Sequence, residues 1–188
     1  MTLLNNPFVT SGYIAPEYFC DRERETEELL RWLVNENNVA IISTRRMGKT
    51  GLIQHCFHLK EIKENYYTFL IDIYATKTLR EFVFQLGKVI LATLKPKGQK
   101  AWELFVNSLV SLKAGFSLDM SGMPQWNLEL GDIKSPETTL DEIFHYLAVS
   151  DKPCIIAIDE FQQVAQYPEK NTEALLRTYV QHLSLIHI

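Results

Sequence analysis

The feature that most constrains the fold is the stretch at residues 39–53, where a short apolar run gives way to a polar turn and then to a helical pattern. The turn ends in Gly48-Lys49-Thr50. A strand followed by a tight loop and a helix directs several backbone N–H groups, and the positive end of the helix, to one point. The stretch therefore predicts a phosphate-binding loop.

The residue types of this loop suit the phosphates of a nucleotide. Gly48 allows close approach of the backbone, Lys49 supplies a cation to the β- and γ-phosphates, and the Thr50 hydroxyl is a ligand for Mg²⁺. The full pattern has glycine at the position of Ser43, and serine lacks the freedom of glycine at positive φ. The alternative is a helix N-terminus that carries Gly-Lys-Thr by chance. The loop residues that we predict to bind nucleotide are Ser43, Thr44, Arg45, Arg46, Met47, Gly48, Lys49, Thr50 and Gly51.

A second motif supports the same chemistry. Residues 153–160 form an apolar run that ends in Asp159 and Glu160. Such a run is typical of a strand buried on both faces of a parallel sheet, and ligands of these sheets bind beyond the carboxyl ends of the strands. We expect Asp159 to hold Mg²⁺ through water and Glu160 to act as general base toward an attacking water. The alternative is a strand followed by a solvated acidic turn.

The composition is that of an ordinary soluble domain. The chain has 188 residues, of which 46% are hydrophobic and 22% charged, and its net charge is −4. This charge gives no overall attraction to nucleic acid or to an anionic membrane. Because no apolar run could span a bilayer and no signal peptide is recognisable, we expect a cytoplasmic protein with no membrane partner. The three cysteines lack the spacing of a metal or redox site.

The periodicity of the chain alternates between helix and strand, which predicts an α/β fold with a mostly parallel sheet. A β-hairpin insertion is expected at about 115–131, where apolar and polar residues alternate around a Ser-Gly-Met-Pro turn. Helices are expected at about 22–34, 52–59, 79–94, 100–112, 135–149 and 171–182, and strands at 39–42, 66–74 and 153–159.

Two weaker signals leave alternatives open. His55 and His58 are three residues apart on an expected helix, as metal ligands can be, but no further ligand is near them in the sequence, which favours packing. Arg45 and Arg46 can contact the γ-phosphate, a neighbouring subunit or a nucleic acid, or they can be solvated.

Three motifs, at residues 19–25, 45–50 and 158–161, together resemble the archaeal-type P-loop ATPases of archaea and bacteria, in the AAA+ and STAND-like branch. The resemblance implies binding or supporting roles near the adenine for Phe19, Arg22 and Glu23. It implies a switch that hydrolyses ATP with Mg²⁺, with Lys49 and Glu160 as catalytic residues. A homo-oligomer or an effector protein is the implied partner, with nucleic acid possible through C-terminal modules. In many relatives glycine stands at the position of Asp21.

The resemblance also implies a sheet with the strand order 5-1-4-3-2, of which this sequence supplies only three strands. We therefore expect residues 1–182 to be the N-terminal part of an ATPase domain that lacks the fourth strand and its sensor residue. Residues 183–188 are also the translation of an adapter used in transposase-based sequencing libraries, so we expect an adapter-derived tail. The alternative is a genuine apolar C-terminus, and a sequencing read made without that adapter distinguishes the two.

Two other functions share the phosphate loop. A small-molecule kinase passes the phosphate to an acceptor rather than to water, and the acidic pair at residues 159–160 favours hydrolysis. A non-hydrolysing scaffold binds ATP only to set its affinity for a partner.

Overall fold

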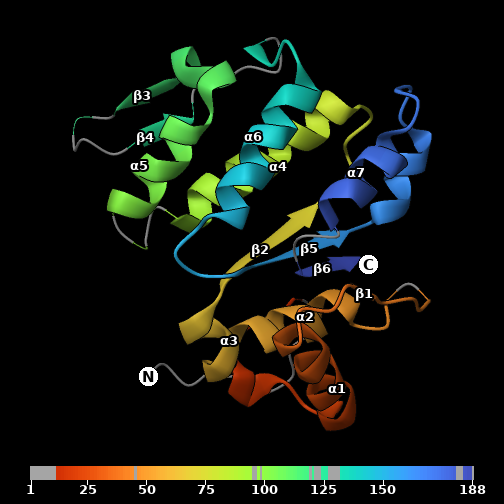
Figure 1. Cartoon of the computed structure of the whole chain (residues 1–188). Helices are drawn as coiled ribbons and strands as arrows, with labels where there is room; N and C mark the ends of the chain where they lie inside the picture. The colour runs from red at the N-terminus through yellow and green to blue at the C-terminus, as the bar shows by residue number, and fades with distance from the viewer. Residues whose placement is uncertain are drawn as a thin grey trace.

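The computed structural model describes residues 12–44, 46–94, 97, 99–118, 120, 124–126, 132–180 and 184–187. Within these residues the chain forms three layers, with helices on both faces of a parallel sheet (Figure 1). The sheet has four strands in the order β1-β6-β5-β2. The strands are β1 (Val39–Ala40), β6 (Ser184–His187), β5 (Cys154–Asp159) and β2 (Tyr67–Asp72). The predicted α/β fold with a parallel sheet is confirmed.

Strand β5 forms the centre of both hydrophobic cores. Its successive side chains point to opposite faces, so that Ile155 and Ala157 join one core while Ile156 and Ile158 join the other. The run is therefore buried on both faces, as its composition predicts. Strand β2 pairs with β5 in parallel over six residues, from Tyr67 opposite Cys154 to Asp72 opposite Asp159. Both strands thus end in a carboxylate at the same edge of the sheet.

Helices α1 (Glu23–Val34), α2 (Lys49–His58) and α3 (Lys60–Asn65) cover one face of the sheet, the lower one in Figure 1. The apolar residues of α1 and α2 recur at helical spacing. Leu33 of α1 and Ile53 of α2 are fully buried in the same core. This face carries the residues that the sequence assigns to the phosphate loop, because α2 begins at Lys49.

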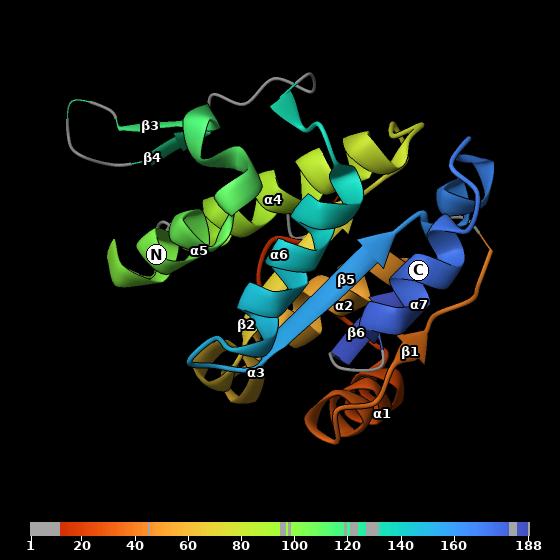
Figure 2. The ribbon, with the colours of Figure 1, turned by 45° about the horizontal axis from the view of Figure 1, so that its top comes forward.

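Helices α4 (Leu79–Leu94), α6 (Pro136–Ala148) and α7 (Thr172–Val180) cover the other face, with α5 (Gln99–Ser108) packed outside them. Figure 2 shows β5 running beside α6 and α7. Three short 3₁₀ helices, η1 (Pro16–Tyr18), η3 (Val110–Gly115) and η5 (Phe161–Gln166), complete the helical elements of the described ranges. The helix predicted at 100–112 ends earlier, because the chain tightens into η3 after Ser108. None of the described helices is long and apolar enough to cross a membrane.

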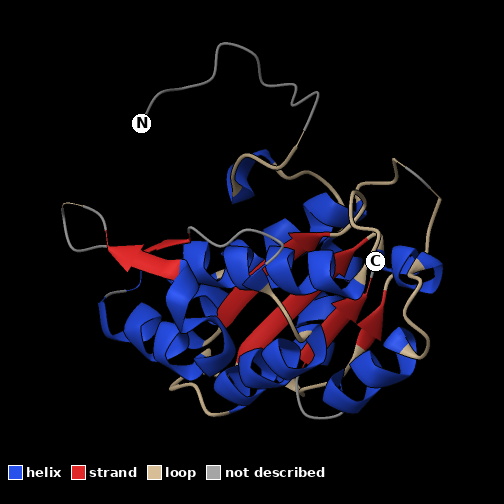
Figure 3. Cartoon of the chain, turned by 90° about the horizontal axis from the view of Figure 1, so that it is seen from above, coloured by secondary structure: helices blue, strands red, loops and turns tan. Residues whose placement is uncertain are grey.

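The predicted hairpin insertion is confirmed. Strand β3 (Phe116–Leu118) pairs antiparallel with β4 (Pro124–Trp126), so that Phe116 lies opposite Trp126. This two-stranded sheet lies apart from the main sheet, beside α5 (Figures 1 and 3). The predicted turn at 121–123 and the end of the insertion, at 127–131, lie outside the described residues.

The expectation that a fourth strand is missing is wrong. Strand β6 lies between β1 and β5, where the resemblance places strand 4, and Ile186 pairs with both Val39 and Ala157. The physical reason is that α7 returns the chain to the amino end of the sheet, where Leu185 and Ile186 have the composition of a buried strand. The adapter origin of residues 183–188 stays a prediction. Strand β1 is also shorter than the predicted 39–42, and Ile42 is 93% exposed.

Candidate functional site

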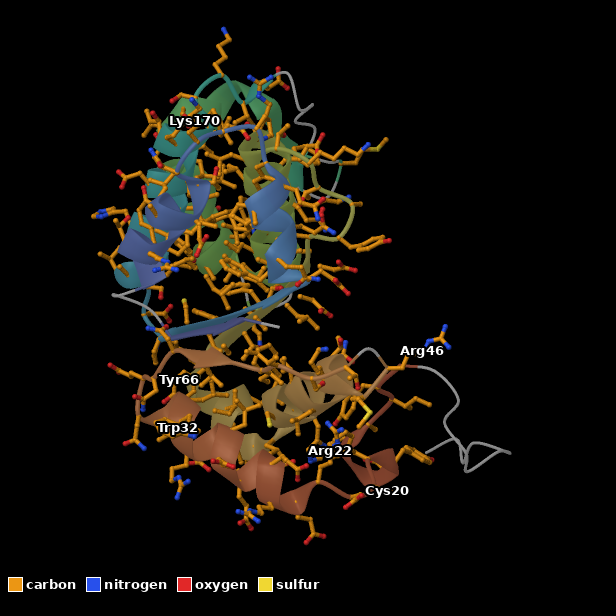
Figure 4. The ribbon with its side chains drawn as sticks, turned by 90° about the vertical axis from the view of Figure 1, so that its right-hand side faces the viewer. Cys20, Arg22, Trp32, Arg46, Tyr66 and Lys170 are labelled. Atoms are coloured by element: carbon orange, nitrogen blue, oxygen red, sulfur yellow. The ribbon has the colours of Figure 1, made fainter. Side chains whose placement is uncertain are left out.

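The predicted phosphate loop connects β1 to α2. Gly48 precedes the helix with a φ of 70°, which glycine adopts without strain, and no atom lies within 4 Å of the position of a Cβ there. Ser43 does not adopt a positive φ. Serine therefore introduces no backbone strain at the position where the full pattern has glycine. Arg46 adopts a φ of 65°, and Figure 4 shows its side chain pointing away from the domain.

Two side chains at the start of α2 make the contacts that define the site. The ammonium group of Lys49 donates a hydrogen bond of 2.9 Å to the carbonyl oxygen of Ser43, across the loop. The hydroxyl of Thr50 donates a hydrogen bond of 2.7 Å to Oδ2 of Asp159. The fold therefore brings together the two motifs that the sequence analysis singled out.

The second carboxylate follows directly after β5. Glu160 has a φ of 60°, and its backbone N–H donates a 2.9 Å hydrogen bond to Oδ1 of Asp159. The side-chain amide of Gln162 donates a hydrogen bond to Oε2 of Glu160. Both carboxylates are thus held by specific donors at the carboxyl edge of the sheet, as predicted.

Two adjoining cavities open at this edge. The larger has a volume of about 430 Å³, and its walls combine the loop with both carboxylates. The smaller has a volume of about 260 Å³, and its walls include the aromatic residues Tyr13, Tyr18 and Phe19. They share Gly12, Tyr13, Gly48 and Gly51. The other residues that line the larger cavity are Arg46, Met47, Lys49, Thr50, Gln54, Asp159 and Glu160. The other residues that line the smaller cavity are Ile14, Ala15, Tyr18, Phe19, Cys20 and Arg22. The larger cavity thus combines a lysine with two carboxylates, and the smaller one presents three aromatic residues.

The segment before α1 connects the two cavities. The guanidinium of Arg22 donates a hydrogen bond to the carbonyl oxygen of Met47, which joins this segment to the loop. Asp21 and Arg22 both adopt positive φ, at 68° and 65°. Glycine would adopt this conformation at position 21 without strain. Figure 4 shows Cys20 and Arg22 in the layer below the sheet.

Not every predicted residue reaches the site. Glu23 begins α1 and lines neither cavity, and Thr44 lines neither as well. Ser43 contributes its carbonyl oxygen to Lys49 rather than a side chain to a wall. Arg45 lies outside the described residues.

Sequence reasoning missed several residues near the site. Tyr13 lines both cavities, and Gln54 lines the larger one. Gln54 follows Thr50 by one helical turn, so helical spacing could have indicated it. Tyr13 lies in a segment without periodicity, which gave no signal. Asp72 lies opposite Asp159 in the register of β2 and β5, and its carboxylate accepts a 2.8 Å hydrogen bond from the backbone N–H of Tyr74.

The two histidines of α2 pack against aromatic rings. Within the part of the chain that the structure describes, no group of three or more His, Cys, Asp or Glu side chains could hold a metal ion. His55 instead stacks on Phe19, with ring centroids 4.2 Å apart and an interplanar angle of 13°. The packing alternative for the pair at positions 55 and 58 therefore agrees with the structure.

The profile of an ATPase domain found predominantly in Archaea matches residues 19–187. The chain belongs to this ATPase family. The predicted resemblance is thus confirmed. The search of curated proteins found no match to this chain.

Solved structures share the fold of the ATPase domain. A Walker-type ATPase of Pyrococcus abyssi is 22% identical, with a TM-score of 0.58, over 97% of this chain and 48% of that protein. The ORC1 protein of Aeropyrum pernix, solved in complex with DNA, is 16% identical, with a TM-score of 0.50, over 89% of this chain and 38% of that one. The ORC2 protein of the same organism, solved as ADPNP-ADP complexes, is 15% identical, with a TM-score of 0.50, over 88% of this chain and 40% of that one. The chain therefore spans about half, or less, of the length of these proteins.

Proposed function

We propose that the domain binds ATP with Mg²⁺ and hydrolyses it to ADP and phosphate as a nucleotide-driven switch. The observation that carries this proposal is the 2.7 Å hydrogen bond between Thr50 and Asp159. It joins the predicted phosphate loop to the predicted acidic strand end, which are far apart in the sequence. Membership of the ATPase family supports nucleotide binding at this site.

The phosphate chain lies in the larger cavity in this proposal. Backbone N–H groups of the loop and the N-terminus of α2 bind the phosphate oxygens. Lys49 exchanges its contact with the carbonyl oxygen of Ser43 for the β- and γ-phosphates. Arg46, which lines the same cavity, adds positive charge on its outer side.

The donors at the bottom of this cavity fit Mg²⁺. The hydroxyl of Thr50 and the carboxylate of Asp159 are hard oxygen ligands, which this ion prefers, and they already lie within hydrogen-bonding distance of each other. The ion, when bound, neutralises charge on the phosphates. The two side chains orient it, Thr50 directly and Asp159 through water.

Glu160 accepts the proton of the attacking water. Its carboxylate lines the larger cavity beside Asp159, and its contact with Gln162 restricts where that carboxylate points. A carboxylate in this position accepts a proton from water in an ATPase and from an acceptor hydroxyl in a kinase. Membership of the ATPase family favours hydrolysis over transfer to a second substrate.

The base lies in the smaller cavity. Phe19 and Tyr13 supply aromatic surface there, and Arg22 fixes the segment to the loop through the carbonyl oxygen of Met47. Glu23 supports this segment from the start of α1 rather than touching the base. The protein that the switch acts on is an effector or a second copy of the chain. A nucleic-acid partner is a further proposal, supported by one structural relative that was solved with DNA.

The replacement of Glu160 by glutamine tests the proposal. Glu160→Gln keeps the shape of the side chain, so we expect ATP to bind with nearly unchanged affinity. The loss of a general base lowers turnover by roughly 10²- to 10⁴-fold. Calorimetry measures the binding, and phosphate release without any added acceptor measures the hydrolysis. The matched control is Glu137→Gln, at an exposed position on α6.

The outcomes separate the alternatives. Unchanged turnover in Glu160→Gln would rule out Glu160 as the base. Tight ATP binding by the unmodified protein without phosphate release would favour the non-hydrolysing scaffold. Phosphate transfer only in the presence of an acceptor would favour the kinase.

A further inference from the structure

His55 lies directly behind the wall of the smaller cavity. It is not among the residues that line either cavity, but it contacts two residues that do. Its ring stacks on that of Phe19, with centroids 4.2 Å apart. Its ring also meets that of Tyr13 edge-on at 5.9 Å, and the Tyr13 hydroxyl lies 3.4 Å from Nδ1 of His55.

Tyr13 and Phe19 need such support because of where they come from. Both flank η1, a single 3₁₀ turn, and neither belongs to a regular helix or strand. His55 lies in α2, whose buried residues anchor it to the sheet. Gly51, one helical turn earlier, lies beside the same ring, since a Cβ there would be in ordinary van der Waals contact with Phe19, at 3.9 Å. The aromatic wall is thus attached to the same helix that begins the phosphate site.

We propose that His55 is a positioning residue that holds Phe19 and Tyr13 as the wall against which the nucleotide base binds. The inference rests on the proposed function, which assigns the base to the smaller cavity. In this proposal His55 contributes to the affinity for the base of the nucleotide and not to the affinity for its phosphate chain.

The protonation state of His55 sets the direction of its hydrogen bond with Tyr13. Burial lowers the pKa of His55, and the neighbouring His58 lowers it further. A neutral Nδ1 accepts a hydrogen bond from the Tyr13 hydroxyl, whose own pKa is raised by burial, Glu17 and Cys56, so it stays protonated. A protonated Nδ1 donates instead, and the Tyr13 hydroxyl oxygen accepts the hydrogen bond. The contact between His55 and Tyr13 is therefore available in both protonation states of the imidazole.

The experiment compares ATP with inorganic tripolyphosphate, both with Mg²⁺, by calorimetry on the full chain. We expect His55→Ala to weaken ATP binding by about 3- to 10-fold, the size of an aromatic contact, and to leave tripolyphosphate binding unchanged. His55→Phe keeps the stacking on Phe19, so we expect it to restore ATP affinity. His145→Ala, at an exposed position on α6, is the matched control.

Four results would overturn the inference. Equal weakening of ATP and tripolyphosphate in both His55 variants would show that the residue only maintains α2. Unchanged ATP affinity in His55→Ala would show that it does not support the base. Tripolyphosphate binding without any preference for ATP in the unmodified protein would show that the smaller cavity holds no base. If the unmodified protein binds neither ligand, the proposed function fails, and this inference fails with it.

Discussion

Replacing Thr50 by valine tests the link between the two halves of the site. Valine keeps the branched shape of threonine and removes only the hydroxyl that donates to Asp159 at 2.7 Å. A hydrogen bond to a charged group contributes about 1.5–3 kcal/mol when it is buried. Both residues are partly exposed, so water replaces part of the lost contact, and we expect a loss of about 1 kcal/mol in unfolding free energy.

The effect on ligand binding is larger and more specific. For a domain of this size a loss of about 1 kcal/mol lowers the melting temperature by only about 2–4 °C, so the variant stays folded. The hydroxyl is also the proposed direct ligand of Mg²⁺. We therefore expect that Mg²⁺ tightens ATP binding in the unmodified protein and has little effect on the affinity of Thr50→Val.

Calorimetric titrations with ATP, in Mg²⁺ and in a chelator, measure this difference, and thermal unfolding measures the stability. Thr178→Val, at an exposed position on α7, removes a hydroxyl far from the site and serves as control. A Thr50→Val protein that keeps the full Mg²⁺ effect would refute the assignment of this hydroxyl to the ion. A much larger loss of stability would show that the hydrogen bond is mainly structural.

Two further predictions concern the core and the thiols. Phe69 in β2 is fully buried, and we expect Phe69→Ala to lower the unfolding free energy by about 3–5 kcal/mol, as urea titration would show; a loss below about 1 kcal/mol would contradict this packing. Burial raises the pKa of Cys56 to about 12 and that of Cys154 to about 11, while Cys20 is exposed. At about pH 8 a thiol reagent should therefore modify only Cys20 in the folded chain and all three cysteines in denaturant, and rapid modification of Cys56 in the native protein would refute its burial.

Strong periodicity is what made parts of this fold predictable. The helix α4 has the bounds expected from its apolar spacing, Leu79–Leu94, and β5 is buried on both faces as its unbroken apolar run predicts. The meeting of Thr50 with Asp159 was also predictable, because carboxyl ends of parallel strands share one edge.

Features set by long-range pairing were not predictable in the same way. The neighbour of Asp159 in the sheet is Asp72, which depends on the register of β2 and β5 and not on either segment alone. The position of Tyr13 depends on its contact with His55 on a distant helix. The strand β6 was not predicted because residues 183–188 were interpreted as an adapter-derived tail, and its place between β1 and β5 depends on pairing with two distant strands.

Three charged residues at the site adopt a backbone conformation that is unfavourable for any residue except glycine. Arg22, Arg46 and Glu160 line the two cavities and adopt positive φ although none of them is glycine. For an L-residue this conformation is unfavourable by roughly 1–2 kcal/mol, and glycine would relieve it. Glycine would also delete the guanidinium or carboxylate that each position presents. A redesign that optimised stability alone would replace these three residues and would produce a more stable domain whose cleft had lost three of its charged groups.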